Sequence, residues 1–586
     1  MRRGLGRAAV LISAITVISR LAGFGRTLVF ARTVGATSLG TAYTTANQVP
    51  NIIFDIVAGG ALTAVVVPVL AGPAGRAERD PAAAADAHRT ASALLTWTIL
   101  LLVPLSVILA LVAGPVVTVL FGRPRGPGTA EVIAVATRML VVFAPQIALY
   151  GLAVVIYGIL QSHHRFTAPA LAPLVSSLVV SAAYLAFLPI GNGYQNNLRG
   201  LPAGAELILS VGTTVGVAAL VATVAVPAWR LRLRLRPALR FPDGVAPRVR
   251  GLAAAGVATL VAQDAALVAV IVLANSRGGT GAIVLYNYGW QMFFLPYAVL
   301  AVPVATTAFP LLSAHAAATG ATLAAAVPAE PRGPRPVRSG ASRGSRASGR
   351  SAEAGAPQSP PSAPAAGADG RFDAVAAAST RAALLVSFLG AAVLTGAAAP
   401  AARVFVPPAS ARELTFTFIA FAPGLVGYGL VANLSRVLLA WGRSRAAALT
   451  TVVGWLAVMV ADLALVPFVP RRWVVPALGL GNSIGLTVAG AALLIAVARV
   501  RGRGCLAGLG RAFAAGLAGG VAGAAAGVLL AVAAGHAFGR SGALPAAALT
   551  VATSIVTVAV FFAIAYLADP ADLRAATARA LRRRPA

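Results

Sequence analysis

The chain lacks lysine altogether, so all 47 of the lysine-plus-arginine residues among its 586 are arginines. Without lysine there is no Gly-Lys-Ser/Thr phosphate loop, which excludes an ATP-driven pump acting by itself. Cys505 is the single cysteine, and this excludes an intramolecular disulfide and a multi-cysteine metal site. The pair His163-His164 has no nearby carboxylate or cysteine with which to bind a metal. With no catalytic or cofactor-binding constellation, the sequence favours a transporter or a scaffold over an enzyme.

Charged residues are scarce, at 11% of the chain, whereas 58% of the residues are hydrophobic and the mean hydropathy is +0.84. A soluble domain of this size does not bury so much apolar surface, so we expect an all-α polytopic membrane protein. The net charge of +31 would suggest nucleic acid in a soluble protein. Here the arginines fall mostly in short loops between apolar segments, where they set orientation, and no nucleic-acid partner is expected.

Fourteen apolar runs are long enough to span a bilayer, at about 20 residues each. They lie near residues 8–32, 42–71, 91–121, 131–160, 167–190, 205–228, 250–275, 281–316, 374–398, 413–440, 446–468, 474–498, 511–535 and 543–567. An even number of spans places both termini on one side. Arginines are concentrated at the termini and in alternate loops, which predicts cytoplasmic N- and C-termini. Residues 317–372, which are rich in Ser, Gly, Arg, Pro and Ala, are expected to form a disordered cytoplasmic tether.

A few charged residues fall inside the apolar runs, where a charge indicates a functional site by default. Arg20 and Arg26 flank Gly23 and Gly25, which permit a bend that brings both guanidinium groups into one cavity. Arginine grips phosphate oxygens with two hydrogen bonds, so a diphosphate headgroup is a natural ligand. Two alternatives stay open: both arginines snorkel to the headgroups, or Asp55 neutralises one of them. Further candidate cavity charges are Arg32, Asp55, Arg138 and Arg436.

Asp264 and Asp462 have no arginine within their own spans. If the two carboxylates face one another, they form a pocket suited to Na⁺ or to a proton as a coupling ion. The alternative is that either acid lies near a span end, in contact with water.

Several motifs resemble, in order, those of the MurJ (MviN) family of lipid II flippases. They are SRLAGFGR at 19–26, VPNII at 49–53, GGAL at 59–62, VPVLA at 67–71, GILQSHHRFTAPALAP at 158–173, LPYAVLAV at 295–302, FPLLS at 309–313 and NSIGL at 482–486. The resemblance implies the fold of the MOP exporter superfamily, with two six-helix lobes around a cationic cavity and two C-terminal helices that form a groove for the undecaprenyl tail. On that pattern residues 1–240 form the first lobe, 241–500 the second lobe interrupted by the tether, and 501–586 the last two helices and a basic tail.

The resemblance also implies roles for particular residues: Arg20 and Arg26 match arginines expected to bind the diphosphate, and Asp264 and Asp462 resemble Na⁺-binding acids. The chain departs from the family at several positions. An acid is replaced by Thr41, an arginine by Phe54, another acid by Gly59, an Asp-Arg pair by Trp290-Gln291, and an asparagine by Val458. These departures remove part of the expected cationic site and put a complete Na⁺ site in doubt.

The leading hypothesis is therefore a flippase that moves lipid II from the inner to the outer leaflet of the bacterial cytoplasmic membrane by alternating access, driven by membrane potential or a cation gradient. Its partners would be lipid II and membrane lipids, with cell-wall synthesis proteins as further candidates and a monomer as the transport unit. The alternatives are an exporter of another undecaprenyl-linked glycan, a MATE-like cation antiporter, and a non-transporting scaffold of the cell-wall machinery.

Overall fold

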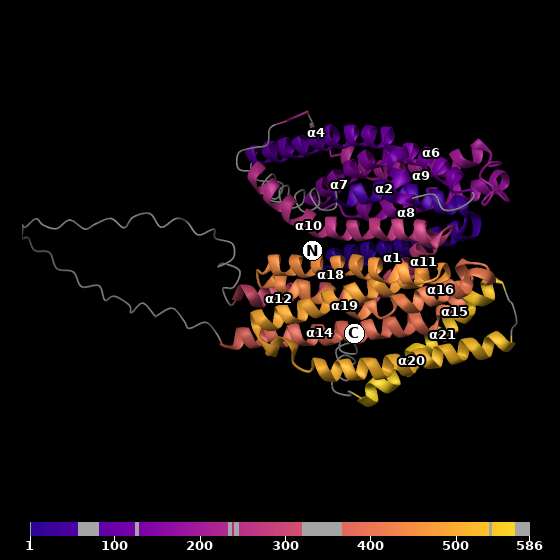
Figure 1. The fold of residues 1–586 in the computed structure, drawn as a ribbon. Coiled ribbons are helices and arrows are strands. Elements are labelled where there is room, and N and C mark those ends of the chain that lie inside the picture. Colours follow the sequence, from indigo (N-terminus) through magenta and orange to yellow (C-terminus); the bar gives the residue numbers. More distant parts are fainter. Residues whose placement is uncertain are drawn as a thin grey trace, which may run out of the picture.

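The structure is a computed structural model that describes residues 2–56, 81–122, 128–231, 237–239, 245–318, 366–537 and 542–568. Within these ranges every regular element is a helix, as the sequence predicted. The long helices run along one common direction and form two groups; the indigo to purple helices belong to one, and the orange and yellow helices belong to the other together with the magenta to pink helices of residues 245–318 (Figure 1). We call these groups the first and the second lobe.

The first lobe is built from the helices that precede residue 230. They are α1 (Arg2–Thr33), α2 (Ser38–Phe54), α4 (Pro81–Leu111), α5 (Ala113–Phe121), α6 (Thr129–Phe143), α7 (Gln146–Ser162), α8 (Thr167–Gly191) and α9 (Ala203–Trp229). Helix α8 packs against both α9 and α1, α2 packs against α6, and α7 packs against α4 and α9. The hydroxyl of Ser19 in α1 donates a hydrogen bond to the carbonyl of Ala170 in α8 at 2.9 Å. These contacts hold α1 on the face of its own lobe.

The second lobe is also a bundle of long helices, but short π-helical and 3-10 segments interrupt its helices more often. Its helices are α10 (Val245–Leu273), η2 (Ala274–Gly278), α11 (Ala282–Pro296), η3 (Tyr297–Ala301), α12 (Val302–Ala318), α14 (Ala366–Gly396), α15 (Ala398–Phe405), α16 (Pro408–Phe421), α17 (Gly424–Ala440), α18 (Ser444–Leu465), η4 (Val466–Phe468), η5 (Arg471–Trp473) and α19 (Val474–Arg501). Pro296 lacks a backbone donor, and the helix loosens into the π-helical turn η3 directly after it. Gly427 lies so close to α19 that a Cβ there would overlap the carbonyl of Leu486, which lets α17 and α19 approach closely.

The last helices, α20 (Leu509–Ala537) and α21 (Ala543–Ala568), pack against one another and attach to the second lobe through α14 and α15. A short 3-10 turn, η6 (Arg503–Leu506), connects them to α19. The expected arrangement of two additional C-terminal helices beside the second lobe is therefore present.

Thirteen helices in the described part of the chain are long and apolar enough to cross a membrane. They correspond to thirteen of the fourteen expected spans. Of the remaining span, expected at 42–71, residues 42–54 belong to α2, and residues 57–71 lie outside the described ranges. The protein is a multi-pass membrane protein, as the sequence predicted.

The tether expected at 317–372 is shorter at both ends than predicted, because α12 extends to Ala318 and α14 begins at Ala366. Between these helices, residues 319–365 lie outside the described ranges. The early start of α14 has a physical cause in Arg501, which binds Asp373 at 2.8 Å and Asp369 at 3.0 Å. The guanidinium of Arg501 also lies 4.0 Å from the ring centroid of Trp441. This cluster ties the first turns of α14 to the end of α19.

The two lobes are joined at the end of the bundle where α1 ends and α2 begins. The Gly281 amide donates a hydrogen bond to the Thr41 hydroxyl at 2.7 Å, and the Asn275 amide group donates one to the Thr45 hydroxyl at 3.1 Å. Gly281 has φ +84°, and a Cβ there would lie 2.6 Å from the Ala36 carbonyl oxygen, so the close contact requires glycine. We call Thr41, Thr45, Asn275 and Gly281 the interlobe latch.

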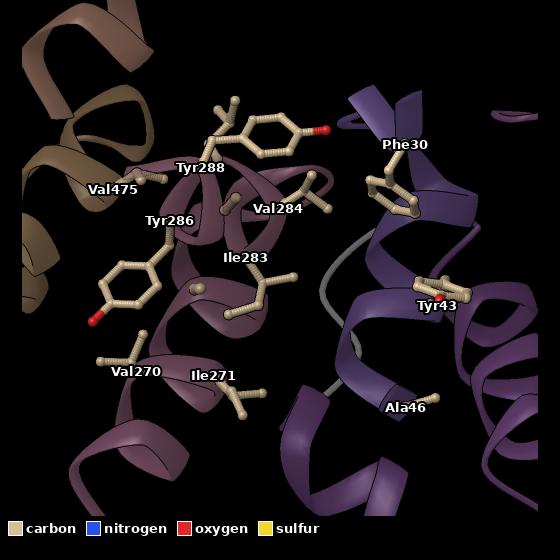
Figure 2. Close-up of a cluster of buried hydrophobic side chains, with 14 of the residues drawn as sticks. Phe30, Tyr43, Ala46, Val270, Ile271, Ile283, Val284, Tyr286, Tyr288 and Val475 are labelled. Carbon is tan, nitrogen blue, oxygen red and sulfur yellow. The ribbon is translucent and has the colours of Figure 1, made fainter. Parts of the chain in front are cut away.

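Buried side chains fill the boundary between the lobes beside this latch. Figure 2 shows Phe30 and Tyr43 on the first-lobe ribbons, with Ile283 and Val284 of the second lobe across the boundary. Inside the first lobe the Tyr43 hydroxyl makes hydrogen bonds with Tyr184 at 2.7 Å and Thr213 at 2.8 Å. Phe30, Tyr43 and Val284 of this core also line the cavity described next.

Candidate functional site

A cavity of about 500 Å³ lies between the two lobes, within the range typical of small-molecule sites. One wall comes from α1, α2, α7 and α8 of the first lobe, and the other from α10, α11 and α18. Its described lining consists of Arg26, Thr27, Phe30, Tyr43, Thr44, Asn47, Gln48, Asn51, Phe54, Asp55, Tyr150, Tyr184, Gln263, Ala266, Leu267, Val270, Val284, Tyr286, Asn287, Tyr288, Trp290, Gln291, Trp455 and Val458. The position between two lobes is the one that alternating access requires.

Arg26 is the only cation in the described lining of this cavity. It lies in the interior of α1, seven residues before the helix ends at Thr33. Its charge is close enough to Tyr43, Tyr150 and Tyr184 for electrostatic interaction with their hydroxyl groups. In the described residues it has no hydrogen bond or ion pair, so its donors face the cavity. A half-buried guanidinium without an anionic partner is the feature that an anionic ligand would complete.

Asp55 is the only acid in the described lining, and it directly follows α2. No ion pair between Asp55 and Arg26 is present in the described structure. The prediction that Asp55 neutralises one of the span-one arginines therefore receives no support from a direct contact. The two charges share one cavity and stay separate in it.

Arg20 lies outside the described cavity lining, on an exposed part of α1. Its guanidinium is 6.0 Å from the ring centroid of Phe294 in α11, a cation–π contact. Arg436 in α17 donates a hydrogen bond to the Ala432 carbonyl, and both arginines lie within electrostatic reach of Tyr297. The described cavity lining thus includes Arg26 but not Arg20, and Arg20 shares Tyr297 with Arg436 as an electrostatic neighbour. The joint role predicted for Arg20 and Arg26 stays a prediction.

Two further candidate charges have protein partners elsewhere. Arg32 donates hydrogen bonds to the carbonyls of Arg403 and Val404 at the end of α15, which links the lobes beside the latch. Arg138 in α6 binds Glu206 in α9 through two hydrogen bonds of 2.6 and 2.9 Å. Neither side chain lines the described cavity.

Asp264 and Asp462 are almost fully buried, at 1% and 0% exposure, and their carboxylate oxygens have no hydrogen-bond partner in the part of the chain that the structure describes. They lie on α10 and α18, two helices that pack against each other. Asn482 on α19 is also fully buried and unpartnered. Unpartnered buried carboxylates are costly unless a proton or a cation accompanies them. No group of three or more His, Cys, Asp or Glu side chains able to hold a metal is found in the described part of the chain.

Of the positions at which the chain departs from the family pattern, Gly59 lies outside the described residues, and the following four are placed by the structure. Phe54 and Gln291 line the cavity, and Phe54 packs on Tyr150 with ring centroids 4.8 Å apart. Thr41 belongs to the latch, where its hydroxyl accepts the hydrogen bond from Gly281. Val458 is buried against Ala262 and Ala266 between α18 and α10. The side chains at these four positions are all uncharged.

Sequence reasoning missed the carboxamide side chains of the cavity. Six of them occur in the described lining: Asn47, Gln48, Asn51, Gln263, Asn287 and Gln291. The Gln48 amide donates a hydrogen bond to the Asn287 side-chain oxygen at 3.3 Å, which joins the two walls. The spacing of Asn47 and Asn51 by one helical turn, within an otherwise apolar run, was a signal that could have revealed the polar face of α2.

A second cavity, of about 720 Å³, is lined almost wholly by apolar side chains. Its residues come from α14, α16, α17, α19 and α20, at the place where the C-terminal helices meet the second lobe. Leu384, Phe388, Leu430 and Leu494 are on one side and Phe513 and Leu517 of α20 are on the other. We call this cavity the apolar groove, and its position agrees with the groove that the family resemblance implied.

Two lobes of membrane helices around a polar interlobe cavity define the class of this protein: it has a fold of the MOP transporter superfamily. Comparisons with solved structures agree. A lipid II flippase MurJ in an inward closed conformation matches with a TM-score of 0.65 and 15% identity, over 95% of this chain and 98% of that one. An inward-facing MATE family multidrug transporter matches with a TM-score of 0.58 and 13% identity, over 84% of this chain and 98% of that one.

The particular family follows from the sequence comparison. The family model for lipid II flippase MurJ matches residues 30–325, about half of the chain, and the chain belongs to this family. The lipid II flippase MurJ of Burkholderia cenocepacia is 29% identical over 327 residues, which is 53% of this chain and 57% of that protein. A lipid II flippase described as probable, from Synechocystis, is 29% identical over 40% of this chain and 43% of its own length. The chain spans about half the length of the curated relatives it matches.

Proposed function

We propose that the protein is a flippase that moves lipid II from the inner to the outer leaflet of the bacterial cytoplasmic membrane by alternating access. The observation that carries the proposal is Arg26, a guanidinium at membrane depth that has no anionic partner among the described residues and lines the cavity between the two lobes. Membership of the MurJ family supplies the class of cargo, a lipid-linked anion.

In this proposal the headgroup and the lipid tail of the cargo bind in two different cavities. Arg26 binds the phosphate oxygens through charge-assisted hydrogen bonds. The carboxamides and tyrosines of the interlobe cavity replace the water that the headgroup loses. The apolar groove, lined by Phe388, Leu430 and Leu517, holds the lipid tail at the membrane side of the second lobe. The headgroup changes sides when the latch opens and the cavity becomes accessible from the opposite leaflet.

The buried acids of the second lobe support a coupling role. Asp264 and Asp462 have no hydrogen-bond partner among the described residues, so binding of Na⁺ or H⁺ would remove the cost of two buried charges. A cation that binds these acids more tightly in one conformation than in the other would shift the equilibrium between the two conformations of the cycle. Tyr286, which lies within electrostatic reach of Asp462, connects this region to the cavity wall.

The proposed orientation places both termini in the cytoplasm and the interlobe latch toward the outer face of the membrane. The support is the arginine-rich composition of the termini and of alternate loops, such as the tract from Trp229 to Arg250. The flippase would act as a monomer, because each lobe and each cavity is formed within one chain.

Complementation tests the proposal directly. A bacterium depleted of its own flippase is supplied with this chain, and exposure of lipid II on the outer leaflet is measured together with growth. Rescue of both is expected. Correct membrane insertion without lipid II exposure would contradict the proposal.

An exporter of another undecaprenyl-linked glycan is the second candidate, because Phe54 and Gln291 replace cationic residues expected in the cavity. In reconstituted vesicles, movement of a different undecaprenyl-linked glycan combined with failure to move lipid II would favour this candidate. A scaffold role predicts that a chain without residues 320–370 loses its function, whereas a flippase without them still moves lipid.

A further inference from the structure

The interlobe cavity is far less cationic than a site built for a bare polyanion. In its described lining one guanidinium, that of Arg26, stands against one carboxylate, that of Asp55, and the formal charges cancel. The remaining polar groups are carboxamides and phenol hydroxyls. Such neutral groups donate and accept hydrogen bonds but supply no net charge. The lining therefore suits a ligand that is mostly neutral and polar, with a single anionic end.

The two walls of the cavity differ in kind. Arg26 and Asp55 belong to the first lobe, whereas the second lobe contributes Trp290 from α11 and Trp455 from α18. The two indole rings have centroids 6.4 Å apart and an interplanar angle of 50°. Trp290 also stacks on Phe293, with centroids 5.3 Å apart, so its ring is held from behind. An aromatic wall supported in this way is a rigid platform for a flat or ring-shaped apolar face.

Hydrogen-bonding groups surround this aromatic wall. Asn287 and Gln291 come from the same helix as Trp290 and also line the cavity. The side-chain oxygen of Asn47 and the hydroxyl of Tyr288 are buried at the cavity and have no hydrogen-bond partner. A buried polar atom without a partner costs free energy, which a ligand hydroxyl or amide would recover on binding.

Sugars with an acetamido group match this combination. The two faces of a pyranose ring carry C–H groups that pack on aromatic rings, and its edge carries hydroxyl and acetamido groups that pair with carboxamides. The cavity volume of about 500 Å³ is large enough for such a ring. We infer that the second-lobe wall, formed by Trp290, Trp455, Asn287 and Gln291, binds an acetamido sugar of the headgroup while Arg26 holds the phosphate. This inference rests on the proposed function, because it assigns part of the same cavity to part of the same cargo.

In this assignment the two lobes bind different parts of the cargo. The first lobe recognises the anionic linkage that any undecaprenyl-linked cargo carries, and the second lobe recognises the sugar. The hydrogen bond between Gln48 and Asn287 at 3.3 Å joins the two walls in the cavity, so a sugar that takes Asn287 as its partner competes with an interlobe contact. Selection among lipid-linked cargoes then depends on the second lobe.

Binding to the purified full chain in lipid nanodiscs tests the inference with three probes: undecaprenyl diphosphate, the same lipid carrying an acetamido disaccharide without peptide, and complete lipid II. The affinity is expected to rise by about tenfold when the disaccharide is added, since a supported ring contact and one or two hydrogen bonds are gained. Little further gain is expected from the peptide. A rise that appears only with the peptide would overturn the inference.

Two variants locate the gain. Trp290→Leu and Gln291→Leu are each expected to abolish most of the sugar-dependent gain while the affinity for undecaprenyl diphosphate stays unchanged. Trp290 packs on four aromatic rings, whereas Gln291 makes no hydrogen bond to a described residue, so Gln291→Leu disturbs the fold less, and the thermal midpoint of each variant checks this. Trp229→Leu is the matched control, because Trp229 is 85% exposed and remote from the lining. Equal losses for all three probes in Gln291→Leu would refute sugar recognition by this wall.

Failure of the inference differs from failure of the proposed function. If the wild-type chain binds none of the three lipids, the flippase proposal itself fails. If it binds all three with equal affinity and moves lipid II in vesicles, the proposed function stands and the sugar assignment is wrong.

Discussion

The interlobe cavity and the apolar groove are of similar size but opposite chemistry. The cavity, at about 500 Å³, is lined by carboxamides, phenols, one arginine and one acid, whereas the groove, at about 720 Å³, is lined almost wholly by aliphatic and phenylalanine side chains. An amphiphile with a polar head and a long tail needs both environments at once. The comparison teaches that the polar and the apolar environment are built by different helices, with α1, α2 and α11 lining the first and α14, α17 and α20 lining the second.

The largest expected effect comes from removing Arg26, the single cation in the part of the cavity lining that the structure describes. Arg26→Gln is expected to lower lipid II transport by about ten- to a hundredfold, because hydrogen bonds to charged groups contribute about 1.5–3 kcal/mol. Transport is measured in vesicles with a long-tailed and a short-tailed substrate, and both should be affected equally. Arg26→Lys, which keeps the charge but not the bidentate geometry, is expected to restore part of the activity. Full activity of Arg26→Gln would remove the phosphate role.

A charge in the apolar groove should discriminate between tail lengths. Leu517→Asp places a carboxylate in the groove wall, and a charge at membrane depth costs about 2.5–3.5 kcal/mol. Binding of the long-tailed lipid is expected to weaken by at least about tenfold, as measured in detergent or nanodiscs. The short-tailed analogue, which does not reach the groove, should bind as it does to the wild type. Leu517→Met is the matched control of similar volume, and equal losses for both tail lengths would break the proposed division.

The buried acids offer a test that touches neither cavity directly. Asp462→Asn removes a carboxylate with no protein partner, so its thermal stability is expected to equal or exceed that of the wild type. If Asp462 binds the coupling cation, any Na⁺- or proton-dependent part of transport should fall severalfold in this variant. The measurement compares transport with and without each gradient. An unchanged gradient dependence in both Asp462→Asn and Asp264→Asn would exclude these acids from coupling.

The smallest effect is expected from the arginine that the structure places outside the cavity. Arg20→Gln removes an exposed cation–π contact with Phe294, and such contacts contribute about 0.5–1 kcal/mol. Transport should fall by no more than about fivefold. A loss as large as that of Arg26→Gln would restore the view that both arginines hold the diphosphate in another state of the cycle.

The sequence was sufficient for the helices and for the general location of the site. Long apolar runs set the spans, because every backbone group in a bilayer must be paired within the protein. The charge of Arg26 identified a cavity because its burial in lipid is so unfavourable. The apolar groove could be predicted only through the resemblance to the MurJ family, since uniformly hydrophobic helices do not reveal from composition which of them separate to leave a space.

The arrangement of side chains within the site could not be predicted in the same way. Arg20 and Arg26 are about 120° apart on an ideal helix, and the packing of α1 against α8, which no local pattern reveals, fixes which of them faces the cavity. The amides of Asn47 and Asn287 come from different lobes, and no local pattern indicates that they line one space. The role of Thr41 depends on the amide of Gly281, about 240 residues later in the chain.

The interlobe latch also sets an energy scale for the proposed cycle. Its two hydrogen bonds, from Gly281 to Thr41 and from Asn275 to Thr45, join neutral groups. At about 1 kcal/mol net for each bond, they favour the latched state by about thirtyfold. Moving one elementary charge through 100 mV supplies about 2.3 kcal/mol. A resting membrane potential acting on a single displaced charge therefore supplies about as much free energy as these two hydrogen bonds contribute, enough to offset their preference for the latched state.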